Sequence, residues 1–188
     1  MTTLRNAVFI DRDGVIIKDR DYVYKSEDLS FIPGSLEALQ TLSRTSYKII
    51  IITNQSGIGR GYFTESDYHV FTETFFEKLS SYGARVDGVY FCPHHPASGI
   101  GRYGTLCACR KPKTGMITKA SHEHGIRLKG SWLIGDKTSD IKAGATAGCK
   151  TILVKTGYAG QDRQCRLKSD LIAKDLFDAV RMILVNGR

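Results

Sequence analysis

The sequence has no long apolar run. Its apolar stretches, such as Ile49–Ile52, have the length of a β-strand, whereas a membrane-spanning helix needs roughly 18 consecutive apolar residues or more. The N-terminal segment reaches Asp11 too soon to contain the apolar region of a secretory signal. We therefore expect a cytoplasmic protein that has no membrane partner.

The chain also lacks internal repeats, low-complexity tracts and any linker that would divide it. Its 188 residues are the length of one domain, since domains run to roughly 100–200 residues. A content of 41% hydrophobic and 24% charged residues excludes a disordered or fibrous chain. We expect residues 1–188 to form a single domain, and the protein to be a monomer.

Acidic residues are fewer than basic ones, 19 against 27, and the net charge is +8. Residues 98–130 contain seven basic residues against the single acid Glu123, which leaves a charge of +6 in this segment. A basic segment suits an anionic ligand of any size, from a phosphorylated metabolite to a nucleic acid. Charge alone does not distinguish between these ligands.

Strand-like and helix-like segments alternate along the chain. The expected strands are Ala7–Ile10, Lys48–Thr53, Val89–Phe91, Ser131–Gly135 and Thr151–Lys155. The expected helices follow Pro33-Gly34, follow Thr64, run from Thr114 or Gly115 to Gly125, and cover Asp140–Ala147 and Leu176–Leu184. This alternation predicts an α/β fold, a doubly wound Rossmann-like parallel sheet with helices on both faces.

Polar residues lie at the carboxyl ends of three expected strands, namely Asp11, Thr53 and Asp136. Ligands of open parallel sheets bind at these ends. One aspartate alone at such a place is usually a helix cap or a turn residue. Three polar residues at one edge of the sheet favour a functional site.

Asp11 and Asp13 put two carboxylates two residues apart, just beyond a buried strand. Like charges at this spacing destabilise each other unless they share a cation or a proton. Mg²⁺ is usually bound by one or two carboxylates together with substrate phosphate, and Asp136 can complete its coordination. A carboxylate can also attack phosphorus, while a second one exchanges protons with the leaving alcohol and with water.

A transferring phosphoryl group further needs hydrogen-bond donors and cations fixed in place. The segment Thr53–Gly57 supplies a hydroxyl, amides and backbone N–H groups, and Arg110 and Lys111 supply two adjacent cations. A lysine in a basic segment is more often a solvated surface residue than a catalytic one. The neighbouring motifs favour the catalytic interpretation here.

Four segments carry a resemblance: F-I-D-R-D-G, I-I-T-N-Q-S-G, C-R-K-P and I-G-D-K-T-S-D, in this order. Together they resemble the four signature motifs of the haloacid dehalogenase (HAD) phosphatases, over essentially the whole chain. The resemblance implies that Asp11 is the nucleophile and Asp13 the acid/base. It implies that Thr53 and Lys111 hold the transferring phosphoryl group, and that Asp11, Asp13 and Asp136 bind Mg²⁺.

The five cysteines do not suggest a disulfide framework, because their number is odd and we expect no export signal. Cys92, Cys107 and Cys109 cluster near His94 and His95. Three thiolates and one imidazole form a closed tetrahedral site typical of structural Zn²⁺. The C-x-H spacing favours His94 over His95, and free reduced cysteines are the alternative. Such a site would hold a loop insert at about residues 92–110.

This loop before C-R-K-P resembles the small-capped branch of the HAD phosphatases that contains heptose bisphosphate and histidinol-phosphate phosphatases. The stretch T-N-Q-S-G-I-G-R-G-Y-F is closer to the heptose enzymes. The resemblance implies a minimal cap, a small phosphorylated sugar as substrate and release of its 7-phosphate through an aspartyl-phosphate. The substrate-site residues that it implies are Asp19, Tyr22, Asn54, Gln55, Ser56, Arg110 and Lys137.

Two other functions compete with this interpretation. One is a histidinol-phosphate phosphatase. The other is a zinc-bearing nucleic-acid-binding protein that would use the basic segment. Against the latter, Tyr103 is the only tyrosine, phenylalanine or tryptophan in that segment, and the carboxylates would repel phosphate in the absence of a metal. We therefore expect no nucleic-acid partner.

Overall fold

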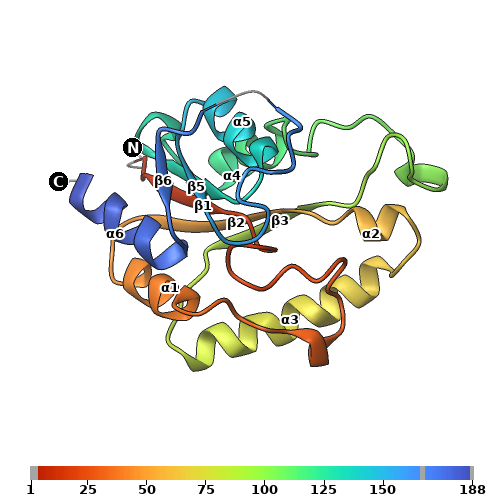
Figure 1. Cartoon of the computed structure of the whole chain (residues 1–188), viewed down its shortest axis with the longest axis horizontal. Helices are drawn as coiled ribbons and strands as arrows, with labels where there is room; N and C mark the ends of the chain where they lie inside the picture. Colours follow the sequence, from red (N-terminus) through yellow and green to blue (C-terminus); the bar gives the residue numbers. More distant parts are fainter. Residues whose placement is uncertain (1–3, 166–167, 187–188) are drawn as a thin grey trace.

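The computed structural model describes residues 4–165 and 168–186, and its centre is a six-stranded sheet (Figure 1). The strands are β1 (Ala7–Ile10), β2 (Lys48–Asn54), β3 (Gly88–Cys92), β4 (Trp132–Gly135), β5 (Lys150–Val154) and β6 (Leu171–Ala173). All neighbours pair in parallel, in the order β3-β2-β1-β4-β5-β6. The chain thus builds the sheet outward from β1, first on one side and then on the other, which confirms the predicted doubly wound α/β class.

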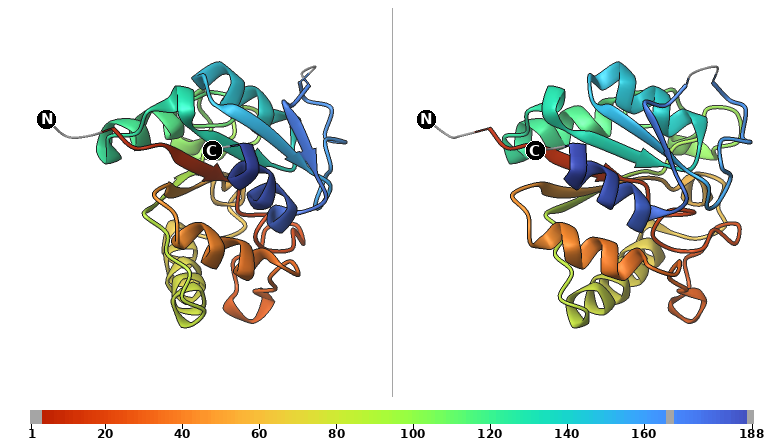
Figure 2. Two further views of the ribbon diagram at one scale, coloured as in Figure 1. Left: turned by 90° about the vertical axis from the view of Figure 1, so that its left-hand side faces the viewer. Right: turned by 60° about the vertical axis from the view of Figure 1, so that its left-hand side comes forward.

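Helices cover both faces of the sheet (Figure 2). They are α1 (Ser35–Ser43), α2 (Ser56–Gly59), α3 (Glu65–Ser81), α4 (Gly115–His124), α5 (Thr138–Ala147) and α6 (Leu176–Asn186). One hydrophobic cluster contains buried side chains of α1, α3 and α6, and another contains those of α4 and α5. The sheet is therefore the middle layer of three.

Strand β1 is fully buried because it serves both layers. Val8 and Ile10 belong to the cluster under α1, α3 and α6, whereas Ala7 and Phe9 belong to the cluster under α4 and α5. Successive side chains of a strand point to opposite faces, so a strand covered on both sides must be apolar throughout. This requirement explains why the sequence is continuously hydrophobic here and stops at Asp11.

Helix boundaries follow the local signals of the sequence. The Thr64 hydroxyl accepts from the Asp67 backbone N–H at 3.1 Å, and the Asp67 carboxylate accepts from the Thr64 backbone N–H at 2.7 Å. This reciprocal capping box starts α3. Gly125 ends α4 in the left-handed conformation, with φ of 59°, a backbone shape that glycine adopts without steric cost.

Strand β6, helix α2 and the start of α5 are among the features that were not expected from the sequence. Strand β6 is only three residues long, and α2 is a single turn that contains two glycines. Helix α5 begins at Thr138, two residues before the expected start, because the Asp140 carboxylate accepts from the Lys137 backbone N–H and fixes the first turn. Contacts with distant segments determine the first two features, whereas a capping contact within the first turn of the helix determines the third.

Loops rather than a cap domain lie at the carboxyl ends of the strands. The long connection from β1 to α1 passes beside α2 and α3, and the connection from β3 to α4 contains the predicted loop insert (Figure 1). The insert is attached to the rest of the protein by Ile100 N–H, which donates to Gly59 C=O at 2.7 Å, and by Tyr103 OH, which donates to Glu65 at 2.7 Å. None of the helices in residues 4–165 and 168–186 has the length and apolarity that crossing a bilayer requires.

Candidate active site

Three adjacent strands bring the predicted polar residues to one edge of the sheet. Asp11 follows β1, Thr53 is in β2 and Asp136 follows β4, and β1 lies between the other two strands. All three side chains are buried, with exposures of 4%, 1% and 0%. The structure therefore assembles the predicted group at the point where the strand order reverses.

Lys111 joins this group from the loop before α4. Its Nζ lies 2.9 Å from Asp11 Oδ1 and 2.6 Å from Asp140 Oδ1, and it donates to the Ile52 carbonyl at 3.0 Å. Burial alone would lower the pKa of Lys111, but the two carboxylates outweigh it and raise the pKa above its ordinary value. Lys111 is thus a fixed positive charge inside the site, not a surface lysine.

Asn54 holds the backbone of Lys111 in place. Its side-chain amide donates to the Lys111 carbonyl at 3.2 Å, and its Oδ1 accepts from the Lys111 backbone N–H at 3.1 Å. The end of β2 is thereby fastened to a segment 57 residues further along the chain.

The carboxylates of Asp11, Asp136 and Asp140 converge so closely that they could hold a metal ion, with one oxygen of each within 4.8 Å of the others. Asp136 Oδ2 accepts from the Tyr158 backbone N–H at 2.8 Å, whereas Oδ1 is buried and has no partner among the described residues. Burial and the neighbouring carboxylates raise the pKa of Asp136 to about 8. A hard cation with oxygen ligands fits this donor set and would relieve the repulsion.

Burial raises the pKa of Asp11 to about 6, although the positive charge of Lys111 acts in the opposite direction.

Two glycines make room beside the Asp136 carboxylate. A Cβ atom at Gly14 or at Gly157 would collide with the Asp136 carboxylate, and both glycines have a positive φ. Close approach of two loops to one carboxylate therefore requires glycine at both places.

Asp13 is not one of the three carboxylates that converge closely enough to hold a metal ion, although the sequence predicts it as a Mg²⁺ ligand. Its Oδ2 accepts from Gln55 Nε2 at 2.9 Å and from Thr53 Oγ1 at 3.2 Å, and Arg12 donates to both of its oxygens. The Asp13 carboxylate thus faces the end of β2, while Asp140 lies beside Asp11 and Asp136.

All seven predicted substrate-site residues line one cavity of about 310 Å³. A smaller cavity of about 30 Å³ shares Asp13, Asn54, Lys137 and Ser139 with it and is also lined by Asp11, Thr53, Lys111 and Asp140. Lys137 lines both cavities, and its Nζ lies 3.2 Å from Asp19 and 4.4 Å from the ring centre of Tyr158. The arrangement is a wide polar cavity that leads to a narrow pocket at the carboxylates.

The larger cavity also contains residues that the sequence analysis did not assign to substrate. Arg60 and His95 join Arg110 in its lining, and Arg60 Nη2 lies 3.1 Å from His95 Nε2. Arg60 belongs to the stretch T-N-Q-S-G-I-G-R-G-Y-F, which was a usable signal. His95 had been considered only as a metal ligand.

The basic segment 98–130 contributes less to the cavities than its charge suggested. Of its seven cations, Arg110 lines the larger cavity and Lys111 lines the smaller one, and none of the other five lines either. Arg102, for example, forms an ion pair with Glu65 at 3.3 Å. Position in the fold, not local charge density, decides which cations face the site.

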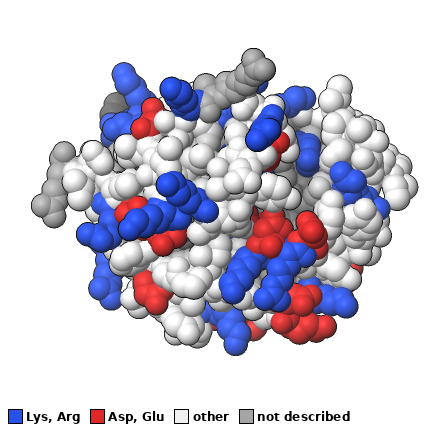
Figure 3. All heavy atoms as spheres, viewed as in Figure 1, with Lys and Arg blue, Asp and Glu red and all other residues white. Residues whose placement is uncertain are grey.

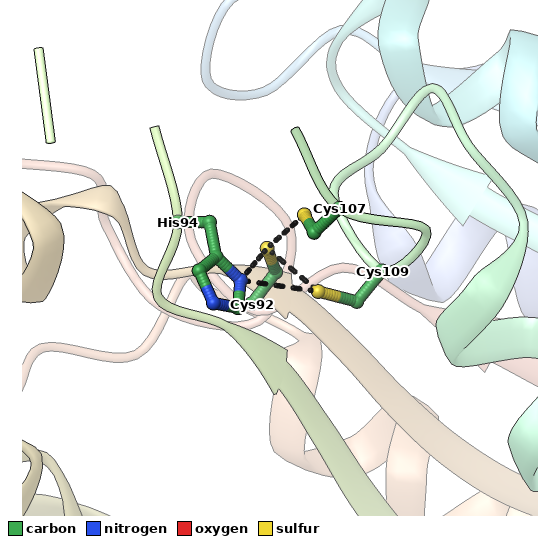
Figure 4. Close-up of side chains that lie close together, drawn as sticks. All are labelled: Cys92, His94, Cys107 and Cys109. Carbon is green, nitrogen blue, oxygen red and sulfur yellow. Dashed lines mark hydrogen bonds between the residues drawn. The ribbon is translucent and has the colours of Figure 1, made fainter. Parts of the chain in front are cut away.

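Cys92, His94, Cys107 and Cys109 point toward one another (Figure 4). His94 Nδ1 lies 3.6 Å from Cys92 Sγ and 3.4 Å from Cys109 Sγ, and Cys92 Sγ lies 3.5 Å from Cys107 Sγ and 3.1 Å from Cys109 Sγ. His95 instead faces Arg60 and accepts from the Ser98 backbone N–H. The geometry therefore favours His94 within a four-residue group that could bind a metal ion.

Comparisons with known proteins identify the family of the chain. Residues 108–179 match the family model described as HAD-hydrolase-like. The D-glycero-beta-D-manno-heptose-1,7-bisphosphate 7-phosphatase of Haemophilus ducreyi is 43% identical over 178 residues, which cover 94% of this chain and 97% of that protein. The D-glycero-alpha-D-manno-heptose-1,7-bisphosphate 7-phosphatase of Burkholderia mallei is 46% identical over 148 residues, 79% of this chain and 78% of that protein.

Among solved structures, the D,D-heptose 1,7-bisphosphate phosphatase of B. bronchiseptica, complexed with magnesium and phosphate, has a TM-score of 0.85 and 30% identity. The match covers 96% of this chain and 99% of that one. The site geometry, the fold and these relatives lead to one assignment. The chain is a phosphoric monoester hydrolase of the HAD superfamily and belongs to the family of the heptose-1,7-bisphosphate 7-phosphatases.

Proposed function

We propose that this chain removes the 7-phosphate from D-glycero-D-manno-heptose 1,7-bisphosphate, in the formation of ADP- or GDP-heptose, with Mg²⁺ at the reacting phosphate and a phosphorylated Asp11 as intermediate. The observation that carries the proposal is a pair of cavities that share lining residues. Asp11, Asp13, Thr53 and Lys111 line the smaller one, and Arg60, His95 and Arg110, which we propose as a second anion-binding end, line the larger one.

In the first half-reaction, an Asp11 carboxylate oxygen attacks phosphorus and the bond from phosphorus to the sugar oxygen breaks. Asp13 gives its proton to that oxygen, so the sugar leaves as an alcohol. In the second half, water attacks the phosphorus, Asp13 takes a proton from it, and the bond to Asp11 breaks. Lys111 and Thr53 hold the phosphoryl oxygens throughout.

Mg²⁺, when bound, neutralises charge on the phosphoryl oxygens and orients the group for in-line attack. Asp11 and Asp136 are its proposed ligands. The Asp13 side chain, which the sequence predicts as a third ligand, is outside this carboxylate group and is left for proton transfer. The orphaned Asp136 Oδ1 and the raised pKa values of Asp11 and Asp136 support a cation at this place. The proposal includes structural Zn²⁺ at Cys92, His94, Cys107 and Cys109, where three thiolates and one imidazole match its preferred ligands.

The second anion-binding end suits the phosphate that is not hydrolysed. Burial, and then the charges of Arg110 and Arg60, lower the pKa of His95. The guanidinium groups of Arg60 and Arg110 therefore both lie near His95, where a bound phosphate would offset their mutual repulsion. The planar donor fork of arginine suits bidentate binding of phosphate. A monophosphate substrate would leave this end of the cavity unused.

We further propose that the protein acts as a monomer in the cytoplasm and binds no nucleic acid. In the view of Figure 3, Lys and Arg side chains are scattered, many of them beside Asp or Glu, rather than joined in one continuous basic patch. Nucleic-acid binding depends on such patches because phosphate contacts supply most of the affinity.

The experiment is phosphate release from a panel of substrates. The panel contains both anomers of heptose 1,7-bisphosphate, fructose 1,6-bisphosphate and histidinol phosphate. We expect kcat/KM for one heptose bisphosphate anomer to exceed that for histidinol phosphate by at least about a hundredfold, since two or more charge-assisted hydrogen bonds are lost with the second phosphate. A preference for histidinol phosphate would contradict the proposal.

A further inference from the structure

Arg12 lies between the two catalytic aspartates of the first motif, and nothing described so far gives it a role. Its side chain is only 3% exposed. A guanidinium group remains charged in proteins, and burying a charge is costly unless the group is paired and hydrogen-bonded. Its location one residue from both Asp11 and Asp13 suggests a purpose connected with the reaction.

The partner of Arg12 is Asp13. Arg12 Nε donates to Asp13 Oδ2 and Arg12 Nη2 donates to Asp13 Oδ1, both at 3.1 Å. Two parallel bonds fix the plane of a carboxylate as well as its position. Arg12 Nη2 also donates to the Val23 carbonyl at 3.4 Å, so the guanidinium group contacts the loop after β1 as well.

Helix α3 holds the guanidinium group from the other side. Its Cζ atom lies 4.8 Å from the ring centre of Phe71 and 5.7 Å from that of Tyr68. Both aromatic residues are buried, with exposures of 0% and 2%. Arg12 therefore cannot rotate away from Asp13 unless α3 moves.

The two oxygens of Asp13 differ in what they can still do. Oδ2 accepts from Arg12, Thr53 and Gln55, so its acceptor capacity is used. Oδ1 accepts from Arg12 alone among the described residues, and Asp13 lines both cavities. Oδ1 is thus the oxygen with room for the proton that the reaction transfers.

We propose that Arg12 is a positioning residue, which holds Asp13 so that Oδ1 faces the leaving oxygen of the substrate. The inference rests on the proposed phosphatase function. When the bond from phosphorus to the sugar oxygen breaks, the proton on Asp13 Oδ1 passes to that oxygen, and Asp13 becomes a carboxylate. When water then attacks phosphorus, Oδ1 takes one proton from it and the bond to Asp11 breaks.

The test compares two esters that differ in their need for a general acid. 4-Nitrophenolate leaves without a proton, whereas a sugar alkoxide needs one. The rate of phosphoenzyme formation is measured in a single turnover by rapid quench, so that the common second half-reaction does not contribute. Arg12→Met should slow this rate about a hundredfold or more with heptose 1,7-bisphosphate, and by less than about threefold with 4-nitrophenyl phosphate.

Arg12→Lys retains the charge but not the fork, and it should show the same selective loss; it also carries the test if Arg12→Met does not fold. The exposed Arg44→Met is the matched control and should leave both rates unchanged. Equal losses with both esters, or full recovery in Arg12→Lys, would overturn the inference alone. A wild-type protein that forms no phosphoenzyme from either ester would overturn the proposed function as well.

Discussion

Several charged side chains in this site are buried, and burying each of them without a partner of opposite charge would destabilise the fold. Asp11, Lys111 and Asp140 are almost completely enclosed and satisfy one another at 2.9 and 2.6 Å. Breaking a buried charge group by removing one member leaves the others uncompensated. Substitutions here therefore need to preserve shape, so that a loss of activity can be separated from a loss of folding.

Asp11→Asn preserves that shape and removes the attacking oxygen anion. We expect the variant to fold and its turnover to fall by a factor of roughly 10⁴ or more, because the covalent route is lost. Phosphate release measures the turnover, and circular dichroism checks the fold. Turnover within tenfold of the wild type would rule Asp11 out as the nucleophile.

Arg110→Ala tests the second anion-binding end. The loss of one charge-assisted hydrogen bond, about 1.5–3 kcal/mol, should lower kcat/KM for the bisphosphate roughly ten- to hundredfold, mostly through KM. A sugar monophosphate that lacks the second phosphate should be affected far less. Lys111→Met, which keeps the length of the side chain and whose folding is checked by circular dichroism, is the comparison, since it should depress turnover on both substrates. Equal losses on both substrates for Arg110→Ala would remove Arg110 from substrate choice.

The motif residues could be located from the sequence, but their partners could not. Short strands that end in Asp11, Thr53 and Asp136 must meet at one edge of a parallel sheet, and they do. Asp140, and not Asp13, lies beside Asp11 because of the position of the first turn of α5. Arg60 contacts His95 because two loops meet whose residues are 35 positions apart in the chain. Contacts of this kind leave no local pattern in the chain.

At the scale of elements, the cysteine-bearing loop has little packing of its own. Ile100 and Leu106 in this loop are exposed, and its contacts include Gly59, Glu65 and the group of four side chains that could bind a metal ion. The same loop continues into Arg110 and Lys111. Disorder in the cysteine-bearing loop would therefore also displace Arg110 and Lys111 from the site.

Cys107→Ala should disturb this loop before it disturbs the sheet. We expect about one equivalent of zinc per wild-type chain, retained through mild EDTA treatment, and loss of that zinc in the variant. Proteolysis within residues 93–109 should increase, and activity should fall as a consequence. Cys149→Ala, which changes a cysteine outside the cluster, is the control. Less than half an equivalent of zinc in the wild type would contradict the metal site.

Elements with strong local signals could be predicted, and elements held by distant contacts could not. The capping box of α3 and the glycine after α4 are encoded within a few residues. Strand β6 depends on Asp170 instead, whose carboxylate accepts from the backbone N–H and the hydroxyl of Thr151 in the neighbouring strand. Helix α2 depends on close packing of Gly59 against the Pro93 carbonyl.

For the whole molecule, the carboxylate group links stability to pH. The pKa values of Asp11 and Asp136 are raised from 3.8 to about 6 and about 8. Folding therefore takes up protons in this range, and these groups make the metal-free protein less stable as pH rises from about 4 to about 8. A cation would replace those protons, so it should stabilise the protein more at high pH.

Thermal unfolding of EDTA-treated protein, with and without added Mg²⁺, measures this effect. We expect Mg²⁺ to raise Tm by roughly 5 °C more at pH 8 than at pH 5, which corresponds to about 1.3–2.5 kcal/mol for a chain of this size. Asp136→Asn removes the main titrating group and should reduce the difference, while Asp11 still titrates in this range. An equal Mg²⁺ effect at both pH values would contradict the assignment of the metal to these carboxylates.

The central claim is hydrolysis at one end of a bisphosphate whose other phosphate is bound and retained. Phosphorus NMR of heptose 1,7-bisphosphate with the enzyme and Mg²⁺ follows both phosphates at once. The account predicts that the 7-phosphate signal disappears, that inorganic phosphate replaces it, and that the 1-phosphate signal persists. Loss of the 1-phosphate, or an unchanged spectrum after prolonged incubation, would contradict it.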